Sequence, residues 1–330
     1  KELGLPAFRA KQIYQWVHEK LVASFDDMTN LSKGLRDQLK ERYELITLQI
    51  VDVRISQIDG TRKYLFGLPD GHIIESVLMK YKHGNSVCIS SQVGCKMGCR
   101  FCASTLNGCV RNLLPSEMLD QIYRISRDTN ERVSNVVIMG SGEPMDNYDN
   151  VIKFIELLNS ERGLNISQRN ITVSTCGIVP KIKELADLKL QITLAISLHA
   201  PNDELRKTMM PIANKYSIAE IMDACRYYLD KTGRRISFEY SLVKGINDTK
   251  ECANELIELV KGLNCHINLI PVNPIKERDY EQSEKNSIKN FRDMLERKGI
   301  NATVRREMGR DIDGACGQLR QNHIDENSAI

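Results

Sequence analysis

Near the start of the chain, apolar side chains recur at helical spacing. The segments LPAFRAKQIYQWVHEK at 5–20 and LSKGLRDQLKERY at 31–43 follow this pattern, which predicts two amphipathic helices. We therefore expect residues 1–46 to form a small helical N-terminal domain. Its basic side chains indicate either a solvated helix face or a patch for an acidic partner; they are Arg9, Lys11, Lys20, Lys33 and Arg36.

Two β-rich runs follow in TRKYLFGLPDGHIIESVLMKY at 61–81. Pro69, Asp70 and Gly71, which separate the runs, are residue types that form tight turns. The pattern therefore predicts a β-hairpin. We assign residues 47–86 to a β-hairpin linker that leads into a cysteine-rich stretch.

From residue 87 onwards, strand-like apolar runs alternate with amphipathic helical runs such as 116–128, 151–159, 219–230, 251–263 and 288–299. Near-continuous apolar strands are typical of a parallel sheet covered by helices. Residues 87–306 are thus expected to form an α/β fold, a partial (β/α)6 barrel of the TIM type, followed by a C-terminal segment at 307–330. A doubly wound sheet would fit the same alternation. The six predicted strands are SVCISSQ (86–92), NVVIMG (135–140), NITVSTC (170–176), QITLAISL (191–198), RISFEYSLV (235–243) and HINLIPVN (266–273).

Composition narrows the class of protein. The 330 residues, 42% apolar and 27% charged, are ordinary for a globular protein with a large core. The sequence has no apolar run of membrane-spanning length and no signal-peptide pattern, so we expect no membrane association. Ten cysteines without a secretion signal indicate a reducing, cytoplasmic location. A net charge of only +3 means that any nucleic-acid surface must be a local patch.

The cysteine-rich stretch, VCISSQVGCKMGCRFCAS at 87–104, holds the strongest chemical signal. Cys95, Cys99 and Cys102 are spaced C-x3-C-x2-C and follow the first predicted strand. A structural zinc site is one alternative, but such a site usually has four ligands in two separated pairs. Three thiolates on an iron–sulfur cubane would leave one iron open for chemistry. The segments GSGEP, STCG, SLHA and PVNP also lie at strand C-terminal ends, where parallel β/α folds gather reactive groups.

The cysteine loop, with Phe101 before its last cysteine, resembles the signature of the radical S-adenosylmethionine (SAM) superfamily. The resemblance implies one 4Fe-4S cluster held by Cys95, Cys99 and Cys102. In that superfamily the open iron binds the amino and carboxylate groups of SAM, and reductive cleavage yields a 5′-deoxyadenosyl radical. The GSGEP segment resembles the one that meets the methionine amino group, and a carboxylate there can pair with an ammonium.

A longer series of segments resembles one subfamily. In order they are CISSQVGC, RNLLPSE, MGSGEPMDNYDNV, STCGIVP, SLHAPND, LIPVNP and DIDGACGQL. The subfamily methylates carbon 2 of an adenine in 23S ribosomal RNA, and many members also act on a transfer-RNA adenine. The match includes PAFRAKQIYQW, which makes residues 1–46 an RNA-binding candidate. It implies these RNAs as partners, a low-potential electron donor of the flavodoxin type, and a monomeric enzyme.

The resemblance also assigns chemistry to residues outside the cluster loop. Adenine carbon 2 is not nucleophilic, so the family first transfers a methyl group from one SAM to a cysteine, which corresponds to Cys316. A second SAM then generates the radical, so two are used per turnover. Cys88 corresponds to the cysteine that forms a disulfide with Cys316 to release the product. Glu75 corresponds to the proton acceptor, a role for which Cys88 is the rival.

The remaining implied contacts concern SAM and RNA. The positions that match the family's SAM contacts are Gly142, Glu143, Ser174, Ser197, Leu198, His199 and Asn273. Arginines near the cluster loop and near Cys316 suit either phosphate contacts or structural ion pairs; they are Arg111, Arg305, Arg306, Arg310 and Arg320.

Two alternatives stay open at the sequence level. The sister subfamily that methylates adenine carbon 8 and confers antibiotic resistance shares the cluster and both outlying cysteines. Pro144 after Glu143 favours the carbon-2 enzymes, because the sister group tends to have alanine there. A different class, a non-catalytic RNA-binding protein with a zinc or iron–sulfur site, would lack SAM cleavage.

Overall fold

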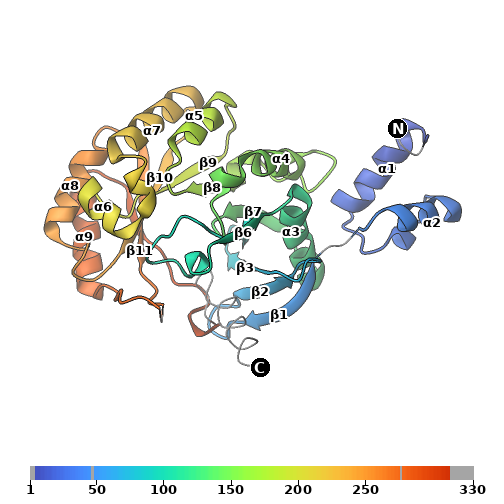
Figure 1. The fold of residues 1–330 in the computed structure, drawn as a ribbon, viewed down its shortest axis with the longest axis horizontal. Coiled ribbons are helices and arrows are strands. Elements are labelled where there is room, and N and C mark those ends of the chain that lie inside the picture. The colour runs from blue at the N-terminus through green and yellow to red at the C-terminus, as the bar shows by residue number, and fades with distance from the viewer. Residues whose placement is uncertain (1–3, 46–47, 276, 313–330) are drawn as a thin grey trace.

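The computed structural model describes residues 4–45, 48–275 and 277–312 (Figure 1). Its N-terminal unit consists of α1 (Ala7–His18), the 3-10 turn η1 (Phe25–Asp27) and α2 (Lys33–Arg42). Both expected helices are present. The side chains of Ser24 and Ser32 cap η1 and α2 by accepting backbone N–H bonds. A separate small core holds this unit together: Phe25, Met28, Leu31, Leu35 and Leu39.

The strands β1 (Gln49–Ile55), β2 (Arg62–Gly67) and β3 (Ile73–Tyr81) form an antiparallel meander. The predicted hairpin is confirmed as β2 and β3, joined by a turn in which Leu68 N–H donates to His72 O at 2.8 Å. Sequence patterning missed β1, because this edge strand is largely exposed and lacks a clear apolar face. Because β3 also pairs antiparallel with β4 (Gly84–Cys88), the meander extends the main sheet.

Within the described residues, the main sheet has ten strands, and from β4 onwards they are parallel and follow chain order. A doubly wound sheet reverses its strand order at a switch point. This sheet does not reverse, so the partial barrel is confirmed. The six predicted strands correspond to β4, β7 (Val133–Ile138), β8 (Ile171–Thr175), β9 (Thr193–Ser197), β10 (Ile236–Leu242) and β11 (Cys265–Pro271). The three-residue β12 (Ala302–Val304), too short to show a pattern, adds a seventh.

Helices cover the parallel strands (Figure 1). The five predicted helices are present as α3 (Pro115–Thr129), α4 (Tyr148–Asn159), α7 (Ile218–Thr232), α8 (Lys250–Val260) and α9 (Lys285–Arg297). Two shorter helices, α5 (Val179–Asp187) and α6 (Asp203–Met209), were not predicted. One continuous apolar core joins the sheet to its covering helices. Short 3-10 turns complete the unit: η2 (Ala103–Thr105), η3 (Pro144–Asn147), η4 (Gln168–Asn170), η5 (Pro211–Asn214) and η6 (Arg310–Ile312).

The N-terminal unit contacts the barrel through α3. His18 Nδ1 lies 2.7 Å from the hydroxyl of Tyr123, and the Arg127 guanidinium donates to the carbonyl of Val22 at 3.2 Å. Figure 1 shows α1 and α2 to one side of the barrel. In the described part of the chain, none of the helices is both long and apolar enough to cross a membrane. The division of the chain at residues 46, 86 and 306 stays a prediction.

Candidate active site

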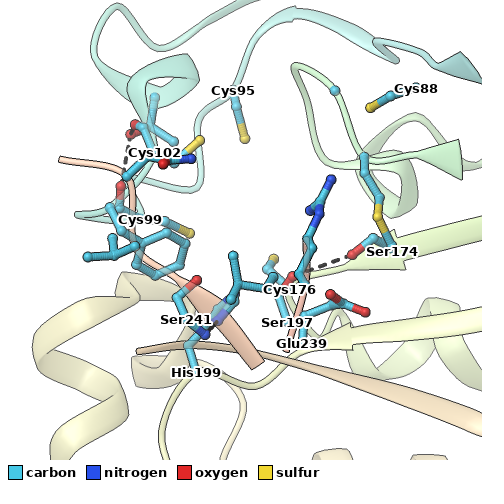
Figure 2. Close-up of a pocket in the computed structure, with 18 of the residues that line it drawn as sticks. Cys88, Cys95, Cys99, Cys102, Ser174, Cys176, Ser197, His199, Glu239 and Ser241 are labelled. Atoms are coloured by element: carbon cyan, nitrogen blue, oxygen red, sulfur yellow. Dashed lines mark hydrogen bonds between the residues drawn. The ribbon is translucent and has the colours of Figure 1, made fainter. Parts of the chain in front are cut away.

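A cavity of about 420 Å³ opens at the C-terminal ends of the parallel strands. It is lined by residues of β3, β4, the cysteine loop, the C-terminal parts of β7 to β11 with some of the segments that follow them, and residues 305–310. Figure 2 shows the three loop cysteines on one side of this space and Cys88 on another. The structure thus brings most of the predicted site residues together: Cys88, Cys95, Cys99, Cys102, Gly142, Glu143, Ser174, Ser197, His199 and Asn273.

The cysteine loop is framed by a two-stranded sheet of β5 (Gln92–Gly94) and β6 (Cys109–Asn112). Gly94 has φ +78°, and a Cβ there would lie 2.1 Å from the carbonyl oxygen of Gly108. Only glycine therefore permits the chain to turn at the start of the loop. The next residue, Cys95, is fixed by its N–H, which donates to the same carbonyl at 2.8 Å.

The surroundings of the loop thiols disfavour the charged thiolate form unless a cation is bound. Burial raises the pKa of Cys95 to about 12 and raises that of Cys99 well above its ordinary value. Thiols bind metal as thiolates, so these groups become ligands only when a cation compensates their charge. Among the described residues, no three His, Cys, Asp or Glu side chains are grouped tightly enough for a single metal ion. Three thiols on one side of a single cavity instead suit a larger iron–sulfur group.

The glycine-rich segment after β7 packs directly on the start of the cysteine loop. Gly142 has φ +113°, and a Cβ there would lie 2.7 Å from the backbone nitrogen of Gln92. The Glu143 N–H donates to the side-chain oxygen of Gln92 at 2.8 Å. In addition, the hydroxyls of Ser141 and Ser104 lie 3.0 Å apart. Glycine at position 142 therefore permits a close approach to the protein's own backbone.

The carboxylate of Glu143 is buried and accepts N–H bonds from Met145 at 3.0 Å and Cys176 at 2.8 Å. Burial raises its pKa, although these hydrogen bonds oppose the shift. The side chains of Thr175 and Cys176 also donate to this carboxylate, which lines the cavity. An ammonium group arriving there would find an acceptor already held in position.

Two serines and a histidine line the cavity at the ends of β8 and β9 (Figure 2). The hydroxyls of Ser174 and Ser197 lie 3.4 Å apart. Asn273, which follows β11, also lines the cavity, with an exposed side chain. Leu198 does not line it, because its side chain is fully buried in the core and only its backbone lies at the strand end.

His199 is neutral and has a defined tautomer. Its Nδ1 accepts the backbone N–H of Ser241 at 2.9 Å, so the ring proton is on Nε2. Burial, with a smaller effect from the Arg206 charge, lowers its pKa to about 3. The ring packs edge to face on Phe101, with centroids 4.5 Å apart. The aromatic residue of the cysteine loop therefore contacts the SLHA segment.

Cys88 and Glu75 lie on the antiparallel side of the sheet. Cys88, buried at the end of β4, packs with Val77 and Met79 of β3. Glu75 precedes these two on the same face of β3 but is not among the cavity-lining residues. It is 4% exposed, and its carboxylate lies 3.4 Å from Nζ of the fully buried Lys63. Cys316, the remaining predicted residue, lies outside the described residues.

The arginines divide into two groups. Arg111 is held between Asp70 and Glu117, with bonds of 2.8 and 2.9 Å to Glu117. Of the two expected roles, Arg111 therefore has that of a structural ion pair. The segment that precedes Cys316 instead reaches the cavity and lines it with Arg305, Arg306 and Arg310. Arg320 lies outside the described residues.

Sequence reasoning missed three buried polar residues of this site. Glu239 lines the cavity from β10, and its carboxylate accepts bonds from Asn268 at 2.7 Å and Ser237 at 3.0 Å. Asn247 donates to the carbonyls of His199 and Ser241 at 2.7 and 2.6 Å. The third is Arg206 of α6. A charged residue inside the apolar run RISFEYSLV was the available signal for Glu239.

The partial barrel, the three-thiol loop and the Glu143 segment above a common cavity define a radical SAM enzyme. The family model described as the radical SAM superfamily matches residues 89–260. The model described as the ribosomal RNA large subunit methyltransferase N-terminal domain matches residues 1–45.

More similar relatives identify the family. The chain is 76% identical over 324 residues to a probable dual-specificity RNA methyltransferase RlmN of Lachnospira eligens, and the match covers 98% of this chain and 93% of the relative. A protein of the same description from Clostridium novyi is 62% identical over 97% of this chain and 93% of its own length. A crystal structure of a radical SAM methyltransferase from Sphaerobacter thermophilus superimposes with a TM-score of 0.93, at 44% identity over 96% and 94% of the two chains.

The chain therefore belongs to the RlmN family of radical SAM RNA methyltransferases. It is an enzyme that methylates RNA and uses a 4Fe-4S cluster and SAM. Cys95, Cys99 and Cys102 would hold the cluster, and Glu143, Ser174 and Ser197 line the cavity beside them.

Proposed function

We propose that this enzyme methylates carbon 2 of an adenine in 23S ribosomal RNA, and an adenine of transfer RNA, through a methyl-cysteine at Cys316. The observation that carries the proposal is that Cys88 lines the same cavity as the loop cysteines. A thiol with no part in ligation has a use at such a site if a covalent intermediate must be resolved. The dual-specificity description of the relatives supports both RNA classes.

The proposed reaction begins with the Cys316 sulfur, which displaces the methyl group from SAM. When bound, the cluster and a second SAM supply the radical that removes a hydrogen atom from this methyl group. The carbon bound to sulfur would then add to adenine carbon 2. The adduct would lose the ring proton to a base and one electron to the cluster, which the cleavage of SAM had left oxidised. The Cys88 thiolate attacks the Cys316 sulfur, so a disulfide forms, the sulfur–carbon bond breaks, and the electron pair stays with the carbon, which takes up a proton.

Glu75 is the proposed acceptor of the ring proton, with Cys88 as the rival. The Glu75 carboxylate forms a buried ion pair with Lys63, whose Nζ lies 3.4 Å away. Because Glu75 is not among the cavity-lining residues, this role requires that the proton reach it past Val77 or through Cys88. Comparison of Glu75→Gln with Cys88→Ala separates the two candidates: the true acceptor variant accumulates an adduct that still carries the carbon-2 hydrogen.

The other assignments follow from the same proposal. Polar groups at the strand ends would hold SAM, with Glu143 on its ammonium and the neutral His199 as a donor through Nε2. The N-terminal unit would bind RNA, together with Arg305, Arg306 and Arg310 at the cavity. A flavodoxin-like electron donor, a monomeric state and a cytoplasmic location stay predictions.

The decisive experiment compares RNA from a strain that lacks this gene with RNA from the same strain after complementation. Digestion and mass spectrometry should find 2-methyladenosine in 23S ribosomal and transfer RNA only after complementation. A complementing gene for Cys316→Ala is the matched control and should restore neither. Appearance of 8-methyladenosine would assign the chain to the sister specificity, and absence of any methyladenosine would contradict the proposal.

A further inference from the structure

Arg206 is completely buried on α6, and among the described residues it forms no salt bridge. Every nearby group that it bonds is neutral. Moving a guanidinium out of water without a carboxylate partner is costly. The Asp203 carboxylate of the same helix acts on this charge only from a distance. The fold therefore retains a buried positive charge without a carboxylate in direct contact among the described residues.

The guanidinium caps the ends of two strands. Its Nε donates to Leu198 O at 3.1 Å. Its Nη2 donates to Cys176 O at 2.6 Å and Ser197 O at 3.2 Å. The other nitrogen, Nη1, is buried and has no hydrogen-bond partner among the described residues. The hydrogen bonds to these carbonyl oxygens explain why a donor group is buried here. They do not explain why the donor is charged, because a neutral amide could donate to the same oxygens.

The helix that carries Arg206 is attached to the cysteine loop. The Arg100 N–H donates to the carbonyl of Met209, the last residue of α6, at 2.9 Å. Cys99 packs with Cys176, Met209 and Met210 in one buried apolar cluster. Arg206 thus lies one helical turn from the residue that holds the loop.

We propose that Arg206 is a positioning residue that raises the reduction potential of the iron–sulfur cluster bound by Cys95, Cys99 and Cys102. Reduction transfers one electron from a low-potential one-electron donor, so the donor is oxidised and the cluster gains a negative charge. A fixed cation stabilises the more negative state, and it does so strongly where burial excludes water and salt. The charge is retained in the core because it assists this electron transfer.

The test measures the midpoint potential of the reconstituted wild-type protein and its Arg206→Gln and Arg206→Lys variants. Dithionite titration with dye mediators is followed by electron paramagnetic resonance, after iron and sulfide content has been matched. Glutamine keeps amide donors for the carbonyls but removes the charge, whereas lysine keeps the charge. Lys207→Gln is the control, because it removes the same charge from the exposed next position of α6.

We expect Arg206→Gln to lower the reduced-to-oxidised ratio at fixed potential at least tenfold, which is 59 mV for a one-electron couple. Arg206→Lys and Lys207→Gln should stay close to wild type. A midpoint for Arg206→Gln that equals that of the Lys207→Gln control would overturn the proposal. If Arg206→Gln retains no iron, Arg206→Lys decides: a wild-type midpoint supports the charge, and a tenfold loss assigns the effect to the carbonyl contacts. RNA and Cys316 take no part, so the outcome is independent of the carbon-2 proposal.

Discussion

The carboxylate of Asp59 accepts a 3.0 Å hydrogen bond from the backbone N–H of Gly309, 250 residues further along the chain. Asp311 adds two more bonds to the same turn between β1 and β2, from the Ser56 hydroxyl at 2.6 Å and the Gln57 N–H at 2.9 Å. Burial alone would raise the pKa of Asp59, but bonds from Thr61, Gly309 and Ser56 outweigh it and lower the pKa to about 2. The segment before Cys316 is therefore anchored by a charge that persists at neutral pH.

Loss of this anchor should uncouple Cys316 from the site. In an Asp59→Ala, Asp311→Ala double variant we expect methylation of the Cys316 peptide to fall about tenfold or more, since a hydrogen bond to a charged group contributes about 1.5–3 kcal/mol. Formation of 5′-deoxyadenosine should persist, because the cluster loop is not touched. Peptide mass spectrometry and chromatography measure the two products. Asp52→Ala, a change at a partly exposed position of β1, is the control, and equal losses of both products would contradict the anchor role.

Gly142→Ala should weaken SAM binding by more than an unfavourable backbone angle alone would. Alanine at a positive φ costs about 1–3 kcal/mol wherever it occurs. Gly299 has φ +75° with nothing near its Cβ position, so Gly299→Ala carries this cost alone. Gly142→Ala must in addition displace Gln92, which fixes Glu143. Equilibrium dialysis with labelled SAM should show weaker binding only for Gly142→Ala, and equal affinities would argue against the close approach.

Cys88→Ala should accumulate enzyme joined covalently to RNA. The thiol lines the cavity, and without it the proposed bond between Cys316 and the base cannot be released. Denaturing gels of protein from cells should show a slow band that disappears with nuclease. Cys225→Ala, which removes a buried thiol from α7, is the matched control and should give no such band. Normal turnover by Cys88→Ala would refute the resolving role.

His199 should leave a signature in the pH dependence of folding. Its burial lowers the pKa to about 3, so below pH 6.5 the unfolded chain binds a proton that the folded chain does not. The free energy of unfolding should therefore fall with decreasing pH between about 6.5 and 3, by about 1.4 kcal/mol per unit from this residue.

Chemical denaturation at several pH values measures this slope. His199→Gln should remove it, whereas His83→Gln, at an exposed position, should not. Nitrogen NMR of labelled histidine should also show the Nε2–H tautomer of His199 unchanged from pH 8 to pH 5. A titration of His199 within that range would contradict the assignment.

Local patterns alone predicted the alternating strands and helices and the cysteine loop, but they left the choice between a partial barrel and a doubly wound sheet open. A strand or helix reveals itself through periodicity over a few residues, and Cys95, Cys99 and Cys102 need only one turn of chain to gather. The C-terminal ends of parallel strands meet at one edge, so the sequence also placed Glu143, Ser174, Ser197 and His199 near one another. Short or exposed elements such as β1, α5, α6 and β12 carried too weak a pattern to be found.

The tertiary structure alone decided which charged side chains are buried and which groups they contact. Lys63 pairs with Glu75 across two strands, Asp59 holds Gly309, and Arg206 reaches the strand ends from a helix that the sequence did not predict. The tertiary structure also places Leu198 away from the cavity, although the adjacent residues Ser197 and His199 line the cavity. A side chain's exposure and partners depend on the packing of segments that are distant in the sequence, whereas periodicity reports only the local face that a residue occupies.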